Sequence, residues 1–458
     1  MTSETGAPRH SLSVLQASTM LVGMVLGVFI FKAPTLAALN TSTPIQFLGL
    51  WLAGGLATLI GALCYAELAT TYPDEGGEYN YLRRAYGNGV GFLFAWGRMS
   101  VIQTGAIAAV AFAYGKYAQL VLPLPFGETG TAIHGALAVA FLTAVQLKGT
   151  KETANAQTFL TALEILGLLL IATIGFMVAK GQPVVAVDAG SSNIGLAMVF
   201  ILLAYGGWNE LSYISNDMKN VRRHMAPVLV LGVIAVTALY LLVNWAYVSV
   251  FGIGGLRKTF TPAADLVGQA FGSAGATVTA LIICAMALST INASIFTGGR
   301  TSYALGRSFP MFGALGHRSS GGGVPVNAIL LQGAICLALI ALGSGTKSGF
   351  EYMVAYTAPV FWLFMIGVGA ALFVLRAKDP DRERPFKVPL YPIVPALWCL
   401  VTLYMFWSSL NYIFGQLWGK MTWGDTGVGA ALGLIILALG IPFYLVGRAK
   451  AATETGSA

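Results

Sequence analysis

Two glycines, a lysine and a proline stand close together in the stretch GMVLGVFIFKAPT, residues 23–35. The chain before this stretch is apolar back to about Leu12, so the four residues interrupt a long apolar segment. Glycine and proline both weaken a helix. Where a helix is interrupted, backbone N–H groups become free, and a half-helix N-terminus carries a positive partial charge. The stretch therefore predicts a place where freed backbone N–H and C=O groups contact a ligand.

A second stretch, AYGGWNE at residues 204–210, has the same character. Its adjacent glycines, Gly206 and Gly207, predict free backbone carbonyls, and the negative end of a half-helix suits a cation such as an amine. A third candidate is Glu164, about 10 Å inside an apolar segment at ~1.5 Å per residue. A carboxylate at that depth indicates function by default: it can carry a proton, bind a cation or pair with a basic residue.

These candidates lie in a chain with the composition of an integral membrane protein. Of its 458 residues, 56% are hydrophobic and 10% are charged, against roughly 25% charged in soluble domains. Apolar runs of ~20 residues predict membrane helices and not the short alternating strands of a barrel. We expect an all-α protein with twelve spans near residues 12–40, 45–72, 89–121, 132–148, 157–179, 194–216, 226–251, 275–305, 325–343, 350–375, 390–413 and 426–447.

The basic residues predict the orientation in the membrane. An even number of spans places both termini on one side, and most of the 26 lysines and arginines fall on the same side as the N-terminus, which indicates the cytoplasm. The net charge of +8 therefore bears on topology and not on nucleic-acid binding. The segments 1–11 and 448–458 are expected to be cytoplasmic tails in a plasma (inner) membrane. The N-terminus lacks the basic start and cleavage site of a signal peptide, so we expect the first span to stay.

The interrupted segments are the first and the sixth. Glycine-interrupted helices in corresponding positions of two halves are typical of transporters built from inverted repeats. We expect a first repeat over residues 12–179, a second over 194–375, and two appended spans over 390–447.

Four stretches resemble the amino acid–polyamine–organocation transporters, particularly the bacterial amino-acid permeases and the light subunits of heteromeric amino-acid transporters. They stand in that family's order and, with the flanking spans, cover roughly residues 12 to 415. The resemblance implies the LeuT-like five-plus-five inverted repeat with helices 1 and 6 broken, and substrates that are amino acids or small amines. The stretches are GALCYAELATTYPDEGGEYNYLRRAYG (61–87), FILLAYGGWNELSYISNDMKNV (200–221), STINASIFTGGRTSYALGR (289–307) and RPFKVPLYPIVPAL (384–397).

The resemblance also implies a binding site. The substrate carboxylate would lie at the first break and the amine at the sixth, where Leu203 stands in place of an aromatic gate. Phe29 replaces the family's last glycine, so the break is shorter, the Phe29 ring narrows the pocket, or the ring points away into packing. The expected substrate-binding residues are Gly23, Val25, Leu26, Gly27, Val28, Leu203, Ala204, Gly206 and Asn209.

Further residues are candidate gate or ion contacts. Glu164 stands where the family often has a lysine, which reverses the charge and indicates proton or cation coupling. Lys32 either reaches the outer interface with its long stem or contacts the substrate. Glu67 is expected to brace a cytoplasmic gate or an ion pair, and Arg98 to pair with an unidentified carboxylate. Ser289 and Asn292 offer oxygens to an ion, although buried hydroxyls often bond to their own helix.

The sequence predicts a secondary transporter of amino acids that works by alternating access and is either proton-coupled or an exchanger. One alternative is a polyamine or small-amine permease, which Phe29 and Glu164 would favour; another is a membrane sensor that does not transport. No nucleophile–base motif, metal-ligand pattern or phosphate loop indicates an enzyme, a metal or a cofactor. The loop LPLPFGETGTAIHG, residues 122–135, has no cysteine, so we expect no heavy subunit joined by a disulfide.

Overall fold

The computed structural model describes residues 12–74, 76–147, 153–179, 192–318, 324–417, 422 and 424–456. The tail expected at residues 1–11 lies outside these ranges. Across them the chain is helical and shows no strand beyond an isolated bridge between Leu12 and Met218. Twelve helical segments are long and apolar enough to cross a membrane, which confirms the predicted all-α, multi-pass class.

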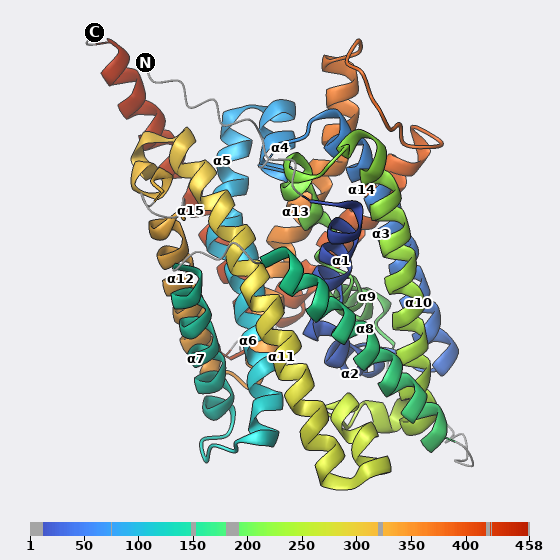
Figure 1. The fold of residues 1–458 in the computed structure, drawn as a ribbon. Helices are drawn as coiled ribbons and strands as arrows, with labels where there is room; N and C mark the ends of the chain where they lie inside the picture. Colours follow the sequence, from blue (N-terminus) through green and yellow to red (C-terminus); the bar gives the residue numbers. More distant parts are fainter. Residues whose placement is uncertain are drawn as a thin grey trace.

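The helices form one bundle (Figure 1). The short α4 (Glu78–Tyr86) lies at one end, called here the α4 end, and α2 (Ala33–Leu39) lies toward the other, the α2 end. Span 3 consists of α5 (Asn88–Gly97), the π-helical turn η2 (Arg98–Ile102) and α6 (Gln103–Val121). The other spans outside the two breaks are α3 (Pro44–Thr71), α7 (Glu128–Leu147), α8 (Thr153–Val178), α10 (Val221–Leu256), α11 (Pro262–Ser308), α12 (Val326–Ser344), α13 (Gly349–Lys378), α14 (Ile393–Leu417) and α15 (Thr426–Gly456), with the turn η4 (Pro310–Gly316) before α12.

The first and sixth spans are broken, as the glycines predict. In the first span, α1 (Val14–Val25) is followed by the 3₁₀ turn η1 (Val28–Phe31) and then by α2. In the sixth, α9 (Ile194–Ala204) is followed by the 3₁₀ segment η3 (Trp208–Asp217). Both interruptions lie in the interior of the bundle, where irregular backbone is tolerated in a membrane protein.

The two breaks touch each other. Gly207 has a φ of +104°, and a Cβ atom at this position would lie 2.4 Å from the carbonyl oxygen of Met24. A glycine is therefore needed there both for its backbone angle and for the close approach. From α10, the buried Tyr240 hydroxyl donates to the carbonyl oxygens of Val25, at 2.7 Å, and Ala204, at 3.0 Å. One side chain thus supplies the hydrogen-bond partner for the last carbonyls of both half-helices, which would otherwise be orphaned.

We predict that Tyr240→Phe destabilises the protein, because both carbonyls lose their donor in a buried site. A buried polar group left unpaired costs about 1–3 kcal/mol. The matched control is Tyr247→Phe on the same helix, since the buried Tyr247 hydroxyl has no hydrogen-bond partner among the described residues. The midpoint of thermal unfolding in detergent should fall for Tyr240→Phe and stay near wild type for Tyr247→Phe; equal midpoints would contradict this role of Tyr240.

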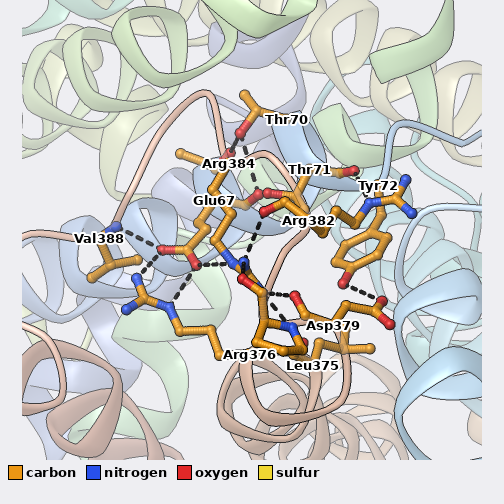
Figure 2. Close-up of polar contacts among 12 residues, drawn as sticks. Glu67, Thr70, Thr71, Tyr72, Leu375, Arg376, Asp379, Arg382, Arg384 and Val388 are labelled. Carbon is orange, nitrogen blue, oxygen red and sulfur yellow. Dashed lines mark hydrogen bonds and ion pairs between the residues drawn. The ribbon is translucent and has the colours of Figure 1, made fainter.

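At the α4 end, Glu67 forms the ion pair expected of it (Figure 2). Its carboxylate accepts from Nε of Arg376 at 2.7 Å and from Nη2 of the same residue at 2.5 Å. It also accepts from the backbone N–H of Val388 at 2.7 Å, and Nε of Arg384 lies 3.5 Å away. Glu67 is only 2% exposed. The end of α3 is therefore tied to the end of α13 and to the segment that follows it.

Neighbouring contacts reinforce this connection (Figure 2). Arg382 donates to the carbonyl of Thr71, the last residue of α3, at 3.1 Å. The Tyr72 hydroxyl donates to Asp379 at 2.7 Å. The Arg-Pro segment that begins at Arg384, one of the stretches that carried the family resemblance, thus packs against the second span.

We predict that Glu67→Ala strongly destabilises the protein, because it leaves Arg376 and Arg384 without their buried counter-charge. Breaking a buried pair by removing one partner costs about 3–5 kcal/mol. The control is Glu383→Ala, which breaks the pair with Arg222, whose side chains are 64% and 73% exposed for Arg222 and Glu383. The midpoint of thermal unfolding should be clearly lower for Glu67→Ala than for Glu383→Ala. Equal midpoints would show that the Glu67 cluster is not needed for stability.

Candidate binding site

A cavity of about 140 Å³ lies between the two breaks. Pockets for drug-sized ligands run to ~300–1,000 Å³, so this one suits a small solute. The first span contributes Met24, Val25, Gly27 and Phe29 to its lining, and the sixth contributes Leu203, Ala204, Gly206, Gly207, Asn209 and Glu210. Residues of α4, α5, η2, α6, α11 and α13 complete the wall.

Three successive backbone N–H groups at the first break have no partner in the described part of the chain. The α-helical ladder ends where the N–H of Leu26 donates to Val22, and bonding resumes where Ile30 donates to Gly27. Among the described residues, no backbone or side-chain acceptor reaches the N–H groups of Gly27, Val28 or Phe29. Unpaired N–H groups at the start of a helical segment form an anion-binding site. Because the donors are backbone groups, Val28 and Phe29 supply them as well as glycine would.

The opposite polarity comes from the ends of α1 and α9. Their last carbonyls, those of Val25 and Ala204, converge on Tyr240. The C-terminal end of a half-helix is negative and favours a cation. The cavity therefore has a backbone-donor side and a backbone-acceptor side, an arrangement that matches a small molecule with a negative and a positive group close together.

A buried charge cluster forms the wall of the cavity next to α4. Arg98 of η2 is 2% exposed, and its Nη2 donates to both carboxylate oxygens of Glu210 at 2.8 and 2.7 Å. Its Nη1 lies 3.6 Å from the carboxylate of Glu78, which is 1% exposed. The guanidinium also lies over the ring of Tyr213, 4.2 Å from the centroid. The carboxylate partner of Arg98 that sequence reasoning left open is thus mainly Glu210, with Glu78 second.

Glu78 has a complete set of donors. Its carboxylate accepts from the Tyr65 hydroxyl at 2.5 Å, from Nδ2 of Asn209 at 2.9 Å and from the Tyr213 hydroxyl at 2.7 Å. Burial raises the pKa of Glu78 above its ordinary value, while Arg98 and the hydrogen bonds from the tyrosines oppose that shift. The cluster links α3, α4, span 3 and the broken sixth span around one carboxylate.

Sequence reasoning assigned no role to Glu78. The available signal was the stretch GGEYNY, where an acidic residue stands among tyrosines directly after two glycines. Sequence reasoning also missed the polar residues Gln103 and Thr297, which line the cavity from α6 and α11. Nε2 of Gln103 donates to the carbonyl of Ser294 at 2.9 Å, so these residues join two walls of the cavity.

The structure brings most of the predicted residues to the cavity, although it does not test their roles. Those in the lining are Val25, Gly27, Phe29, Leu203, Ala204, Gly206 and Asn209. Gly23 lies within α1, and Leu26 and Val28 are fully buried; none of these three residues is in the lining. The ring of Phe29 packs on Phe350, with 5.2 Å between centroids.

Glu164 lies outside the cavity lining, on α8. It is 1% exposed, and no donor among the described residues reaches either carboxylate oxygen. One turn earlier, Thr161 donates to the carbonyl of Thr19 in α1 at 3.0 Å, so this part of α8 packs against the half-helix that leads to the first break. An ionised carboxylate without a partner is expensive to bury. Glu164 therefore requires either a proton or a bound cation.

The two candidates on α11 differ from each other. The hydroxyl of Ser289 is buried and has no partner among the described residues. Asn292 is already engaged, because its side-chain oxygen accepts from Nε2 of Gln146 at 2.8 Å. Neither lines the cavity, whereas their neighbours Thr290 and Ser294 do.

Lys32 does not extend to the open surface as a snorkelling side chain would. It is 8% exposed and lines a second, smaller cavity at the α2 end, with its Nζ 5.0 Å from the centroid of the Phe260 ring.

Comparison with known proteins places the chain in a family. The profile described as amino acid permease matches residues 12–431. Similar proteins include the b(0,+)-type amino acid transporter 1 of Mus musculus, 28% identical over 88% of this chain and 83% of that protein. The large neutral amino acids transporter small subunit 2 of Mus musculus is 29% identical over 96% of this chain and 81% of its own. The serine/threonine exchanger SteT of Bacillus subtilis (strain 168) is 26% identical over 90% and 93%.

These matches confirm the resemblance that the four sequence stretches indicated. The profile covers nearly the whole chain, including both breaks and the cavity between them. The relatives are named as transporters and exchangers, and none of these names is that of an enzyme. The chain is thus a multi-pass membrane protein that belongs to the amino acid permease family.

Proposed function

We propose that this protein is a secondary active transporter that moves amino acids across the plasma membrane by alternating access. The observation that carries the proposal is the pairing of free N–H groups and half-helix carbonyl ends across one small cavity. An α-amino acid carries a carboxylate and an ammonium on one carbon atom, which matches that pairing. We place both termini, and with them the α4 end, on the cytoplasmic side, as the Lys/Arg distribution indicates.

In the proposed complex the substrate carboxylate accepts from the N–H groups of Gly27, Val28 and Phe29. The ammonium lies at the negative ends of α1 and α9, with Asn209 beside it. The substrate side chain then meets an apolar wall, which favours a neutral side chain such as that of leucine. The apolar residues of this wall are Phe94, Ile102, Val110, Phe361, Phe364 and Met365. The charged groups nearby are already paired with each other.

Alternating access would use the two halves, residues 12–179 and 194–375, as inverted repeats. The corresponding positions of the two breaks support this division. Tyr240 joins the half-helices α1 and α9, so we expect them to move together. The pair of Arg98 with Glu210 joins span 3 of the first half to span 6 of the second. This pair and the Glu67 cluster would close the path toward the cytoplasm in the state described here.

We propose Glu164 as the coupling residue. Its burial without a counter-charge or donor among the described residues supports a carboxylate that takes up and releases a proton as α1 moves against α8. Exchange of one amino acid for another is the alternative mode, and the name of the Bacillus subtilis relative, an exchanger, favours it.

The amine-permease alternative rested on Phe29 and Glu164. The N–H of Phe29 remains free for a carboxylate, and Glu164 lies outside the cavity lining. Both observations favour an amino acid over an amine. The segment 122–135 contains no cysteine, so we propose that the chain works without a disulfide-linked subunit.

We predict that proteoliposomes containing the protein take up leucine faster with an inward proton gradient, and that Glu164→Gln removes this stimulation. The neutral amide cannot release a proton, so the coupling step is lost. The measurement is uptake of labelled alanine, leucine, arginine, glutamate and putrescine, with and without the gradient. Glu383→Gln, at an exposed carboxylate, is the control and should behave as wild type.

Other results would change the proposal in defined ways. Counterflow that persists in Glu164→Gln without a gradient would make the protein an exchanger and Glu164 a structural residue. Uptake of putrescine without any amino-acid signal would establish the amine permease. Saturable amino-acid binding without uptake would identify a sensor.

A further inference from the structure

The second cavity lies at the α2 end, next to the first. Its volume is about 60 Å³, and its lining comes from five parts of the chain: the junction of η1 and α2, α6, α7, the segment between α10 and α11, and α13 with the residues before it. The charged residues around it are Lys32, Lys116, Glu128, Lys347 and Glu351. Of these five residues, only Lys32 was given a role from the sequence, as a candidate gate or substrate contact.

Not all of these charges are satisfied by each other. Lys116 and Glu128 form an ion pair. Lys32 forms neither a hydrogen bond nor an ion pair with any residue in the described ranges, although more than nine-tenths of its surface is buried. Its ammonium lies over the face of the Phe260 ring, with Nζ 5.0 Å from the ring centroid. A buried ammonium without an anionic partner is costly, and here it faces a cavity.

Glu351 supplies the complementary charge. It is partly buried, lies in the lining of the same cavity, and forms no ion pair with any described residue. Lys32 and Glu351 both line this cavity, yet they form no salt bridge within 4 Å of each other. A cation and an anion that share a small cavity without bonding to each other leave room for a ligand with both charges between them.

One aromatic contact separates this cavity from the first. Phe350 lines the second cavity, Phe29 lines the first, and the two rings pack together. The cavities therefore lie in sequence along the path from the α2 end to the breaks.

We propose that the second cavity is an additional binding site for the zwitterionic head group of an α-amino acid, with the carboxylate at Lys32 and the ammonium at Glu351. This site would hold a substrate molecule on the outer side of the Phe29–Phe350 pair before it enters the central cavity. The proposal rests on the proposed function, because it assumes that amino acids are the substrates.

The test is equilibrium binding of radiolabelled leucine to the purified protein in detergent, with leucine uptake measured in parallel. The wild type should bind two leucines per chain. Lys32→Met keeps the length of the side chain but removes its charge, and it should bind one. Glu351→Gln should also bind one and serves as a second variant if Lys32→Met does not fold. Lys258→Met, at an exposed lysine of the same end that lines neither cavity, should still bind two.

A wild type that binds a single leucine and transports it, with the same stoichiometry in Lys32→Met, would overturn the second site and leave the proposed function intact. A wild type that neither binds nor transports leucine or any other amino acid of the panel would overturn both.

Discussion

Backbone N–H and C=O groups inside a membrane need partners, and this constraint governs the structure around the two broken helices. The carbonyls at the ends of α1 and α9 find their partner in a single hydroxyl, that of Tyr240. The N–H groups after the first break find none in the described part of the chain. A protein of this kind tolerates unpaired groups at that depth where they line a cavity. The unpaired donors and the paired acceptors together give the cavity its dipolar character.

The buried charged side chains fall into two groups, those that form ion pairs and those that do not. Glu67 with its arginines, and Arg98 with Glu210 and Glu78, form buried clusters in which each charge has an opposite neighbour. Such clusters are poor binding groups because their charges are already engaged, but they connect helices that a transport cycle would have to separate. Glu164 and Lys32 are buried without a bonded counter-charge among the residues that the structure describes, and they carry the two proposals that go beyond the central cavity. The contrast between paired and unpaired charges is therefore the basis of both proposals.

Much of the fold could be predicted from the sequence, because hydrophobic runs and glycines act locally. The twelve spans and both breaks follow from patterns within about 30 residues. The pairings could not be predicted in the same way: Tyr240 and Val25 are 215 positions apart, and Arg98 and Glu210 are 112 apart. Lys32 shows the same limit of prediction from sequence. Its long stem allowed either a position at the outer interface or a contact with the substrate, and the distant residues that bury it could not be identified from the sequence. From the sequence, Phe29 was expected to shorten the break or to narrow the carboxylate site. In the structure its ring packs on Phe350, and its N–H has no acceptor among the described residues.

The proposed function requires that the cavity recognise both charges of an amino acid. The most direct measurement compares the equilibrium binding of leucine with that of 3-methylbutylamine, which lacks the carboxylate, and of 4-methylpentanoate, which lacks the amine. Hydrogen bonds to charged groups contribute about 1.5–3 kcal/mol, and 1.4 kcal/mol is tenfold in affinity. We therefore predict that each analogue binds at least about tenfold more weakly than leucine. Binding of 3-methylbutylamine as tight as that of leucine would contradict the account, because the free N–H groups at the first break would then have no part in recognition.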